Sequence, residues 1–88
     1  MYFVYLLQSL KFSRLYIGFT PDDVNRRLAK HNSGLVLSTK TYKPWKLIYF
    51  EAYLNRKDAL GRERYLKSGS GRKFLNKQLR NYFTDKVK

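Results

Sequence analysis

One carboxylate of this chain falls where a charge is costly. On a helical wheel, Glu63 shares the apolar face of its expected helix with Ala59 and Leu66. A carboxylate at the edge of a core requires an ion pair or a metal ion, and the chain has only 6 Asp and Glu residues in total. Glu63 is therefore a candidate ligand for a divalent metal. A structural ion pair with Arg27 is the alternative.

A second charged group, Arg27, borders an apolar helix face together with His31. On the wheel of their expected helix, both residues flank the stripe that contains Val24, whereas Arg26 faces solvent. A guanidinium beside a core needs a carboxylate or a phosphate partner, which makes Arg27 a candidate for phosphate contact. The alternative is an arginine whose stem packs on a sheet while its head stays in water.

The chain is also rich in tyrosine, with 8 in 88 residues. Tyr5 and Tyr16 fall on two adjacent expected strands, and Gly18 shares a sheet face with Tyr16. We expect this glycine to leave open space beside the tyrosine. Tyrosine is also a common core residue, so a purely structural role is the alternative for each.

The charge balance favours a polyanionic partner. The chain carries 19 Lys and Arg residues and a formal net charge of +13. Positive charges this numerous repel one another in a compact fold, and binding to nucleic acid or to an anionic membrane relieves that repulsion. Because the basic residues are spread along the chain, nucleic acid is favoured over a membrane; a solvated cationic surface is the alternative. Candidate contacts are Lys40 and Lys43 in a basic loop, and Ser70, Gly71, Arg72 and Lys73 at a helix start, where Ser70 could equally be only a cap.

Several classes of protein are excluded or disfavoured. Without cysteine, the chain has no disulfide, no cysteine-ligated zinc and no catalytic thiol, and its single histidine excludes a His-rich metal site. No apolar run approaches the roughly 18 residues of a membrane span. The apolar N-terminus lacks a charged leader and a cleavage site, so we interpret it as a strand and expect a cytoplasmic protein.

The elements that must position these residues follow from hydrophobic patterning and capping signals. We expect one α+β domain over residues 1–83, in the order ββαβαα, with the first two strands antiparallel, and a basic tail over 84–88 that frays. Thr20 is the expected cap of the first helix, Pro21 its first residue, and 35–44 a mobile loop. The expected strands are 2–7, 14–19 and 45–54, and the expected helices are 21–31, 55–67 and 71–82.

Taken in order, these residues resemble the GIY-YIG nuclease family. The second half of its signature is present as Tyr16-Ile17-Gly18, and Phe3-Val4-Tyr5 replaces the first half and keeps its tyrosine. Residues 23–31 resemble the family's arginine helix, and residues 59–67 resemble the helix that carries its metal-binding glutamate. The resemblance covers nearly the whole chain and is strongest to small standalone bacterial members.

The resemblance implies a three-stranded antiparallel sheet flanked by helices, and divalent-metal-dependent cleavage of a phosphodiester in nucleic acid, DNA in preference to RNA. It implies that Glu63 holds one Mg²⁺ or Mn²⁺, that Arg27 stabilises charge in the transition state, and that Tyr5 or Tyr16 takes a proton from water. His31 would orient that tyrosine or the water, and Asn76 is a looser candidate.

A chain of this length has no room for an attached DNA-binding module. We therefore expect a protein partner that supplies targeting, recognition of nucleic-acid shape or damage, or weak action on many structures. Two alternatives to a nuclease stay open: a non-catalytic nucleic-acid-binding module on the same fold, and a basic protein of the ribosome or nucleoid.

Overall fold

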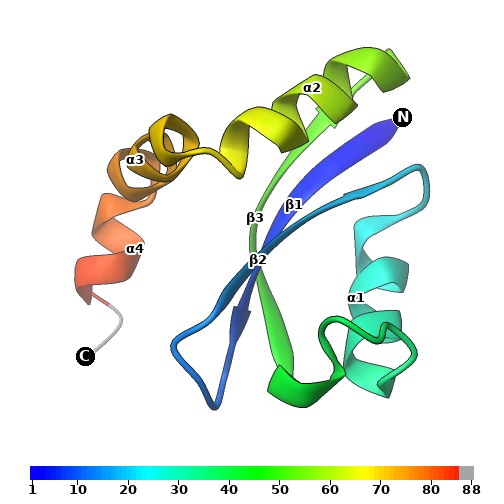
Figure 1. Cartoon of the computed structure of the whole chain (residues 1–88), viewed down its shortest axis with the longest axis vertical. Coiled ribbons are helices and arrows are strands. Elements are labelled where there is room, and N and C mark those ends of the chain that lie inside the picture. Colours follow the sequence, from blue (N-terminus) through cyan, green and yellow to red (C-terminus); the bar gives the residue numbers. More distant parts are fainter. Residues whose placement is uncertain (86–88) are drawn as a thin grey trace.

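The chain folds as an antiparallel sheet with helices packed on both of its faces (Figure 1). The structure, a computed structural model, describes residues 1–85. The three strands lie in the order β2-β1-β3, so the expected α+β class and the antiparallel pairing of the first two strands are confirmed. The elements in chain order are β1 (Tyr2–Ser9), β2 (Leu15–Thr20), α1 (Val24–Ser33), the 3-10 turn η1 (Lys40–Tyr42), β3 (Trp45–Tyr53), α2 (Arg56–Leu66), α3 (Gly69–Gln78) and α4 (Arg80–Asp85).

The central strand β1 is the most apolar because both of its faces are covered. Val4 and Leu6 are buried in the cluster formed with α2 and α3, whereas Tyr5 and Leu7 are buried in the cluster formed with α1. This alternation follows from the two-residue period of a strand. It gives the sheet a face on the α1 side and a face on the α2 side, and the odd-numbered side chains of β1 belong to the first.

The alternation of side chains between the two faces of the sheet is interrupted part-way along β3. Leu6 pairs with Tyr49, but the next residue, Leu7, pairs with Leu47, so one residue of β3 is extra at this point. Such a bulge shifts the alternation of the side chains that follow it. Leu47 accordingly packs on the α1 side, whereas Tyr49 packs on the α2 side.

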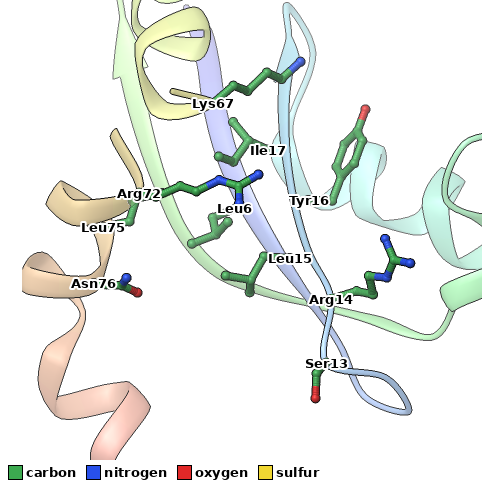
Figure 2. Close-up of a pocket in the computed structure, with 10 residues that line it drawn as sticks. All are labelled: Leu6, Ser13, Arg14, Leu15, Tyr16, Ile17, Lys67, Arg72, Leu75 and Asn76. Atoms are coloured by element: carbon green, nitrogen blue, oxygen red, sulfur yellow. The ribbon is translucent and has the colours of Figure 1, made fainter. Parts of the chain in front are cut away.

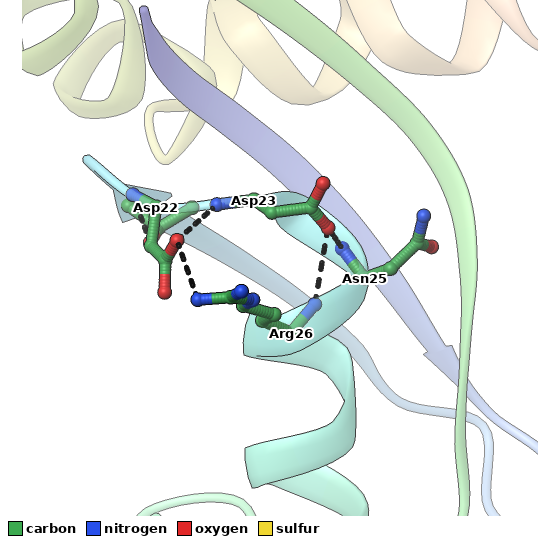
Figure 3. A network of polar contacts seen from close by, with 5 residues as sticks. Asp22, Asp23, Asn25 and Arg26 are labelled. Atoms are coloured by element: carbon green, nitrogen blue, oxygen red, sulfur yellow. Dashed lines mark hydrogen bonds and ion pairs between the residues drawn. The ribbon is translucent and has the colours of Figure 1, made fainter.

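Helix α1 begins later than the sequence predicts. Thr20 is the last residue of β2, where it pairs with Phe3, so the expectation that it caps the helix is wrong. The cap is Asp23, whose side chain accepts hydrogen bonds from the backbone N–H groups of Asn25 at 2.7 Å and Arg26 at 3.2 Å (Figure 3). Aspartate is among the strongest capping residues, so the helix begins at Val24, four residues after the last residue of β2.

Helix α1 ends at Ser33, two residues later than the sequence predicts. Gly34 follows the last helical residue with a φ of 84°, in the left-handed region that favours glycine. Its N–H and that of Leu35 donate to carbonyl groups of the final turn. At the same end, the Asn32 side chain accepts a hydrogen bond from the N–H of Trp45 and donates one to its carbonyl oxygen. This exchange fixes α1 against the start of β3.

The C-terminal part contains two helices where the sequence predicts one. Ser68 caps α3, two residues earlier than expected, and Leu79 interrupts the helical backbone with φ −107° and ψ 23°. The structure therefore has four α-helices within residues 1–85 and not three. Gly71 permits the sharp α2–α3 corner because a Cβ there would overlap the backbone of Leu66.

Helix α4 extends two residues past the expected end of the domain at residue 83. Its Tyr82 hydroxyl donates a hydrogen bond to the side chain of Gln8 in β1, and the helix continues through Thr84 and Asp85. The rest of the expected tail, residues 86–88, lies outside the described residues. Within residues 1–85, no helix is both long and apolar enough to cross a membrane.

Candidate active site

A chain of hydrogen bonds crosses the buried space between β1 and α1. The hydroxyl of Tyr5 lies 2.8 Å from Nε2 of His31, and Nδ1 of the same imidazole lies 2.7 Å from Oγ1 of Thr39. Thr39 in turn donates to the carbonyl oxygen of Val36 at 3.3 Å. Because the Thr39 hydroxyl proton is used in that bond, the Thr39 oxygen accepts a hydrogen bond from Nδ1–H of His31. Nε2 of His31 then carries no proton and accepts a hydrogen bond from the Tyr5 hydroxyl.

The loop that supplies Thr39 differs from its prediction. The sequence of 35–44 has no apolar period and predicts a mobile segment, yet Thr39 is buried and η1 follows it. The indole N–H of Trp45 donates to the Thr39 carbonyl oxygen at 2.9 Å. Buried hydrogen bonds, which leave no periodic signal in a sequence, hold this loop.

Burial sets the protonation states of this chain. It lowers the pKa of His31 from 6.5 to about 4, with a smaller contribution from the nearby Arg27 charge. Burial raises the pKa of Tyr5 above 10.0; the charges of Tyr16 and Glu63 act in the same direction, and a hydrogen bond from Arg27 opposes them. At neutral pH the imidazole is therefore neutral and the phenol keeps its proton.

Arg27 points its guanidinium at this phenol. Its Nε–H donates to the Tyr5 hydroxyl at 3.4 Å, and the residue is half-buried. Arg26, by contrast, has 77% of its side chain exposed and reaches back to Asp22, 4.0 Å away (Figure 3). Within residues 1–85, Arg27 has no carboxylate partner. The helix face assigned to each arginine by the wheel is the one the structure shows.

The two tyrosines share one face of the sheet with Gly18. Their ring centroids are 6.3 Å apart, and the Tyr16 ring lies 5.0 Å from that of His31. Gly18 pairs with Tyr5 across the strands, and a Cβ at Gly18 would overlap the Tyr5 phenol. The open space that we expect beside Gly18 is therefore filled by Tyr5, because the ring lies flat across the neighbouring strand.

Glu63 reaches the site from α2, where Ala59 and Leu66 face the core. Its side chain is 21% exposed, and one carboxylate oxygen lies 3.2 Å from Nζ of Lys67. The ion pair is therefore with Lys67 and not with Arg27. The charge of Glu63 also acts to raise the pKa of the Tyr5 phenol, as the smallest of the influences on it.

This donor set is compatible with one hydrated ion and not with a metal cage. Residues 1–85 contain no cluster of three or more His, Cys, Asp or Glu side chains able to hold a metal. Mg²⁺ is commonly bound by one or two carboxylates and several waters. The half-buried carboxylate of Glu63, which keeps contact with solvent, fits that mode of binding.

A furrow beside this cluster lies between β2 and α3, and is also lined by Leu6 of β1 and by Lys67, the residue that follows α2 (Figure 2). Its cavity has a volume of about 540 Å³, and Arg72 extends from α3 toward β2. Tyr16 and Asn76 both line it, so two of the predicted α3 candidates, Arg72 and Asn76, lie on the same cavity as a predicted catalytic tyrosine. The lining residues are Leu6, Ser13, Arg14, Leu15, Tyr16, Ile17, Lys67, Arg72, Leu75 and Asn76.

The remaining basic candidates lie outside this cavity. Lys73 is exposed on α3, and Lys40 and Lys43 are exposed in the loop that follows α1. The backbone N–H groups expected to bind phosphate at Gly71 and Arg72 are already engaged by Ser68. Because α3 starts earlier than predicted, these groups belong to its first turn and cap.

Comparison with known proteins identifies the family. Residues 1–78 match the family model described as the GIY-YIG catalytic domain. The chain belongs to the GIY-YIG family. This family comprises nucleases that bind nucleic acid and generally use a divalent metal. No solved structure gives a significant match to this GIY-YIG chain.

Small bacterial GIY-YIG proteins are among the relatives. A UPF0213 protein of Clostridium perfringens is 38% identical over 68 residues, which cover 76% of this chain and 71% of the relative. A UPF0213 protein of Staphylococcus epidermidis is 40% identical over 68 residues, which cover 76% of this chain and 80% of the relative. A UPF0213 protein of Staphylococcus aureus is 39% identical over 75 residues, which cover 84% of this chain and 89% of the relative.

Two polar features of this GIY-YIG domain escaped the sequence analysis. One is Thr39, and the other is Glu51 on the α2 side of β3. Arg62 donates to both Glu51 oxygens, at 2.9 and 3.1 Å, and the hydroxyls of Tyr49 and Tyr53 each donate at 2.6 Å. An acid flanked by tyrosines two residues away on each side was the available signal.

This network is structural. Burial acts to raise the pKa of Glu51, but hydrogen bonds from Arg62 and the two tyrosines outweigh it, so the pKa is lowered. The same contacts with the carboxylate, together with burial, raise the pKa of Tyr49 and of Tyr53 to about 12. Both oxygens of the Glu51 carboxylate are occupied by these hydrogen bonds.

Proposed function

We propose that this chain is a divalent-metal-dependent endonuclease that hydrolyses phosphodiester bonds in DNA. The observation that carries the proposal is Arg27, whose half-buried guanidinium bonds the neutral hydroxyl of Tyr5 and has no carboxylate partner within residues 1–85. A cation left unneutralised beside a core is suited to an anionic group that arrives with the substrate. Placed at a phosphate, it stabilises charge that develops in the transition state.

Tyr5 and His31 form the proton-transfer pair in this proposal. As water attacks phosphorus, its proton passes to the Tyr5 oxygen while the phenol proton passes to Nε2 of His31, 2.8 Å away. A P–O bond forms to the water oxygen, and the P–O bond to the leaving oxygen breaks. Because Tyr5 is never required to be a free phenolate, its raised pKa is not an obstacle. Tyr16 packs beside the pair and is the second candidate.

Glu63 is the proposed ligand of the divalent ion, Mg²⁺ or Mn²⁺. When bound, such an ion supplies positive charge to the phosphate and the leaving oxygen. Lys67 now neutralises the Glu63 carboxylate, so its ammonium must move away when the ion binds. The cavity that Lys67 lines offers it a place beside the substrate.

A cleavage assay tests the proposal. Single-stranded, duplex and branched DNA, with RNA of the same sequence, are incubated with Mg²⁺, with Mn²⁺ or with EDTA. Glu63→Gln should abolish cleavage and keep nucleic-acid binding, whereas Asp58→Asn, which removes an exposed acid from the same helix, should leave the rate unchanged. Cleavage at wild-type rates by Glu63→Gln, or undiminished cleavage in EDTA, would refute the role of Glu63.

A non-catalytic nucleic-acid-binding module is the second candidate. The ion pair of Glu63 with Lys67 favours it, because this pairing leaves the carboxylate neutralised without a metal. Binding of every substrate without cleavage in either metal would establish this second function. For either function, we propose that a protein partner supplies targeting.

A further inference from the structure

The furrow beside β2 is longer than the cavity next to the tyrosines. A second cavity of about 360 Å³ continues it toward α4 and ends at Phe83. The two cavities share four lining residues, which makes them one continuous depression along the edge strand of the sheet. The shared residues are Ser13, Arg14, Leu15 and Asn76.

The lining of this furrow combines cations with an apolar floor. Arg14, Lys67 and Arg72 are its charged residues, and within the described chain no Asp or Glu lines either cavity. The Arg14 guanidinium lies over the Tyr42 ring, 4.5 Å from its centroid, and Lys67 is paired with Glu63, so Arg72 is the cation that extends into the furrow. The floor beneath them is aliphatic, with Tyr16 at one side. A ligand that matches both features carries negative charge along one side and flat apolar groups along the other. The aliphatic residues are Leu6, Leu15, Ile17 and Leu75.

Nucleic acid has this chemistry only where its bases are unpaired. In a duplex the base faces are stacked inside the helix, so phosphates and base edges alone reach a protein surface. In a single strand the base faces are available to pack on aromatic and apolar side chains while the backbone follows the cations. The furrow is thus suited to a single strand.

The furrow reaches the candidate active site through Lys67, which lines it and pairs with Glu63 at 3.2 Å. The Tyr16 ring projects to the other side of β2, where it lies 5.0 Å from that of His31. A strand that lies in the furrow therefore brings its backbone to Glu63, the proposed metal ligand.

We propose that the β2 furrow binds an unpaired strand of nucleic acid, so that single strands, flaps or gaps are preferred to continuous duplex. This inference rests on the proposed function, because it names the substrate class of the same site.

Two matched pairs of variants test it. Leu15 and Leu10 are exposed leucines, at 48% and 61%, but only Leu15 lines the furrow; Arg72 and Lys77 are exposed cations of α3, but only Arg72 lines it.

Binding is measured by fluorescence anisotropy in EDTA, with a labelled single strand and with the duplex that it forms. The full-length wild type should bind the single strand at least about fivefold more tightly. Leu15→Ser should abolish most of this preference, and Leu10→Ser should retain it. Arg72→Glu should weaken single-strand binding by about tenfold, and Lys77→Glu, with the same change of charge, by about twofold. Thermal unfolding confirms that each variant is folded.

Equal affinity for single strand and duplex, or equal effects within each pair of variants, would overturn the inference. Its failure is separable from that of the nuclease proposal. Single-strand preference without any cleavage in Mg²⁺ or Mn²⁺ rejects the nuclease and keeps the furrow. Cleavage of continuous duplex as fast as of single strands rejects the furrow and keeps the nuclease.

Discussion

Gly18 lies opposite Tyr5 in the β1–β2 pair, and the Tyr5 phenol fills the space that a Cβ at Gly18 would occupy. The ring can lie across the neighbouring strand only because that position lacks a side chain. Its hydroxyl is thereby directed to His31, 26 residues further along the chain. The glycine of the family signature thus positions the phenol of the proposed proton-transfer pair.

Gly18→Ala should therefore destabilise the fold. Forcing a methyl group into the packed space beside Tyr5 should lower the free energy of unfolding by about 1–3 kcal/mol. Gly61→Ala is the control, because no atom lies within 4 Å of a Cβ built at Gly61 in α2. That change should raise stability by roughly 0.5–1 kcal/mol. Urea denaturation measures both, and an unaltered midpoint for Gly18→Ala would contradict the steric explanation.

The two neighbouring arginines should differ sharply in their effect on cleavage. Arg27→Ala removes the guanidinium beside Tyr5 and should lower the rate by about 10²–10³. Arg26→Ala removes a side chain that is 77% exposed and paired only with Asp22, so the rate should change little. Single-turnover cleavage of the same substrate compares the two, and similar losses would show that the catalytic face of α1 is misassigned.

His31 should make stability depend on pH. Its pKa is lowered from 6.5 to about 4 by burial and by Arg27, so between these values the unfolded chain binds a proton that the folded chain does not. Stability therefore falls as pH falls through this interval, by about 2 kcal/mol between pH 7 and pH 5. Glu51, whose pKa is lowered from 4.5, contributes below this window.

The pH dependence is measured by urea denaturation at several pH values. His31→Gln removes the titrating group, so its stability should vary much less over the same range. A wild-type curve that is flat between pH 7 and pH 5, or a His31→Gln curve as steep as the wild type, would show that burial does not hold this imidazole neutral.

Thr39 should act as a positioning residue. Thr39→Val keeps the shape but removes the oxygen that accepts from Nδ1 of His31, at a cost of about 1–3 kcal/mol in stability. It also frees the imidazole to change tautomer, so cleavage should slow, and Thr39→Ser should restore it. Nitrogen chemical shifts of the His31 ring report the tautomer directly. A slower Thr39→Val enzyme with an unchanged tautomer would indicate a merely structural role.

Much of this site could be predicted from local patterns. Helical periodicity assigned Arg27 and His31 to the inner face of α1 and Arg26 to solvent, and strand alternation placed Tyr16 and Gly18 on one face. These patterns suffice because each depends on a single element. They say which side chains face inward, and the structure brings those side chains together.

The remaining features depend on contacts between elements. Continued alternation from Trp45 would place Tyr49 and Glu51 on the α1 side, but the extra residue in β3 moves them to the other face. The sequence has no marker for that bulge. Thr39 was missed for a related reason, since its partners, His31 and Trp45, belong to two other elements.

The pairing of Arg62 with Glu51 has a consequence for its neighbour in sequence. Arg62 and Glu63 are consecutive residues of α2 and point about 100° apart around the helix. Arg62 reaches Glu51 of β3, and Glu63 reaches Lys67. Two charge-assisted hydrogen bonds to a strand prevent the helix cylinder from rolling about its long axis. Arg62 therefore fixes the rotation of α2 about its axis, and with it the direction of Glu63, the proposed metal ligand.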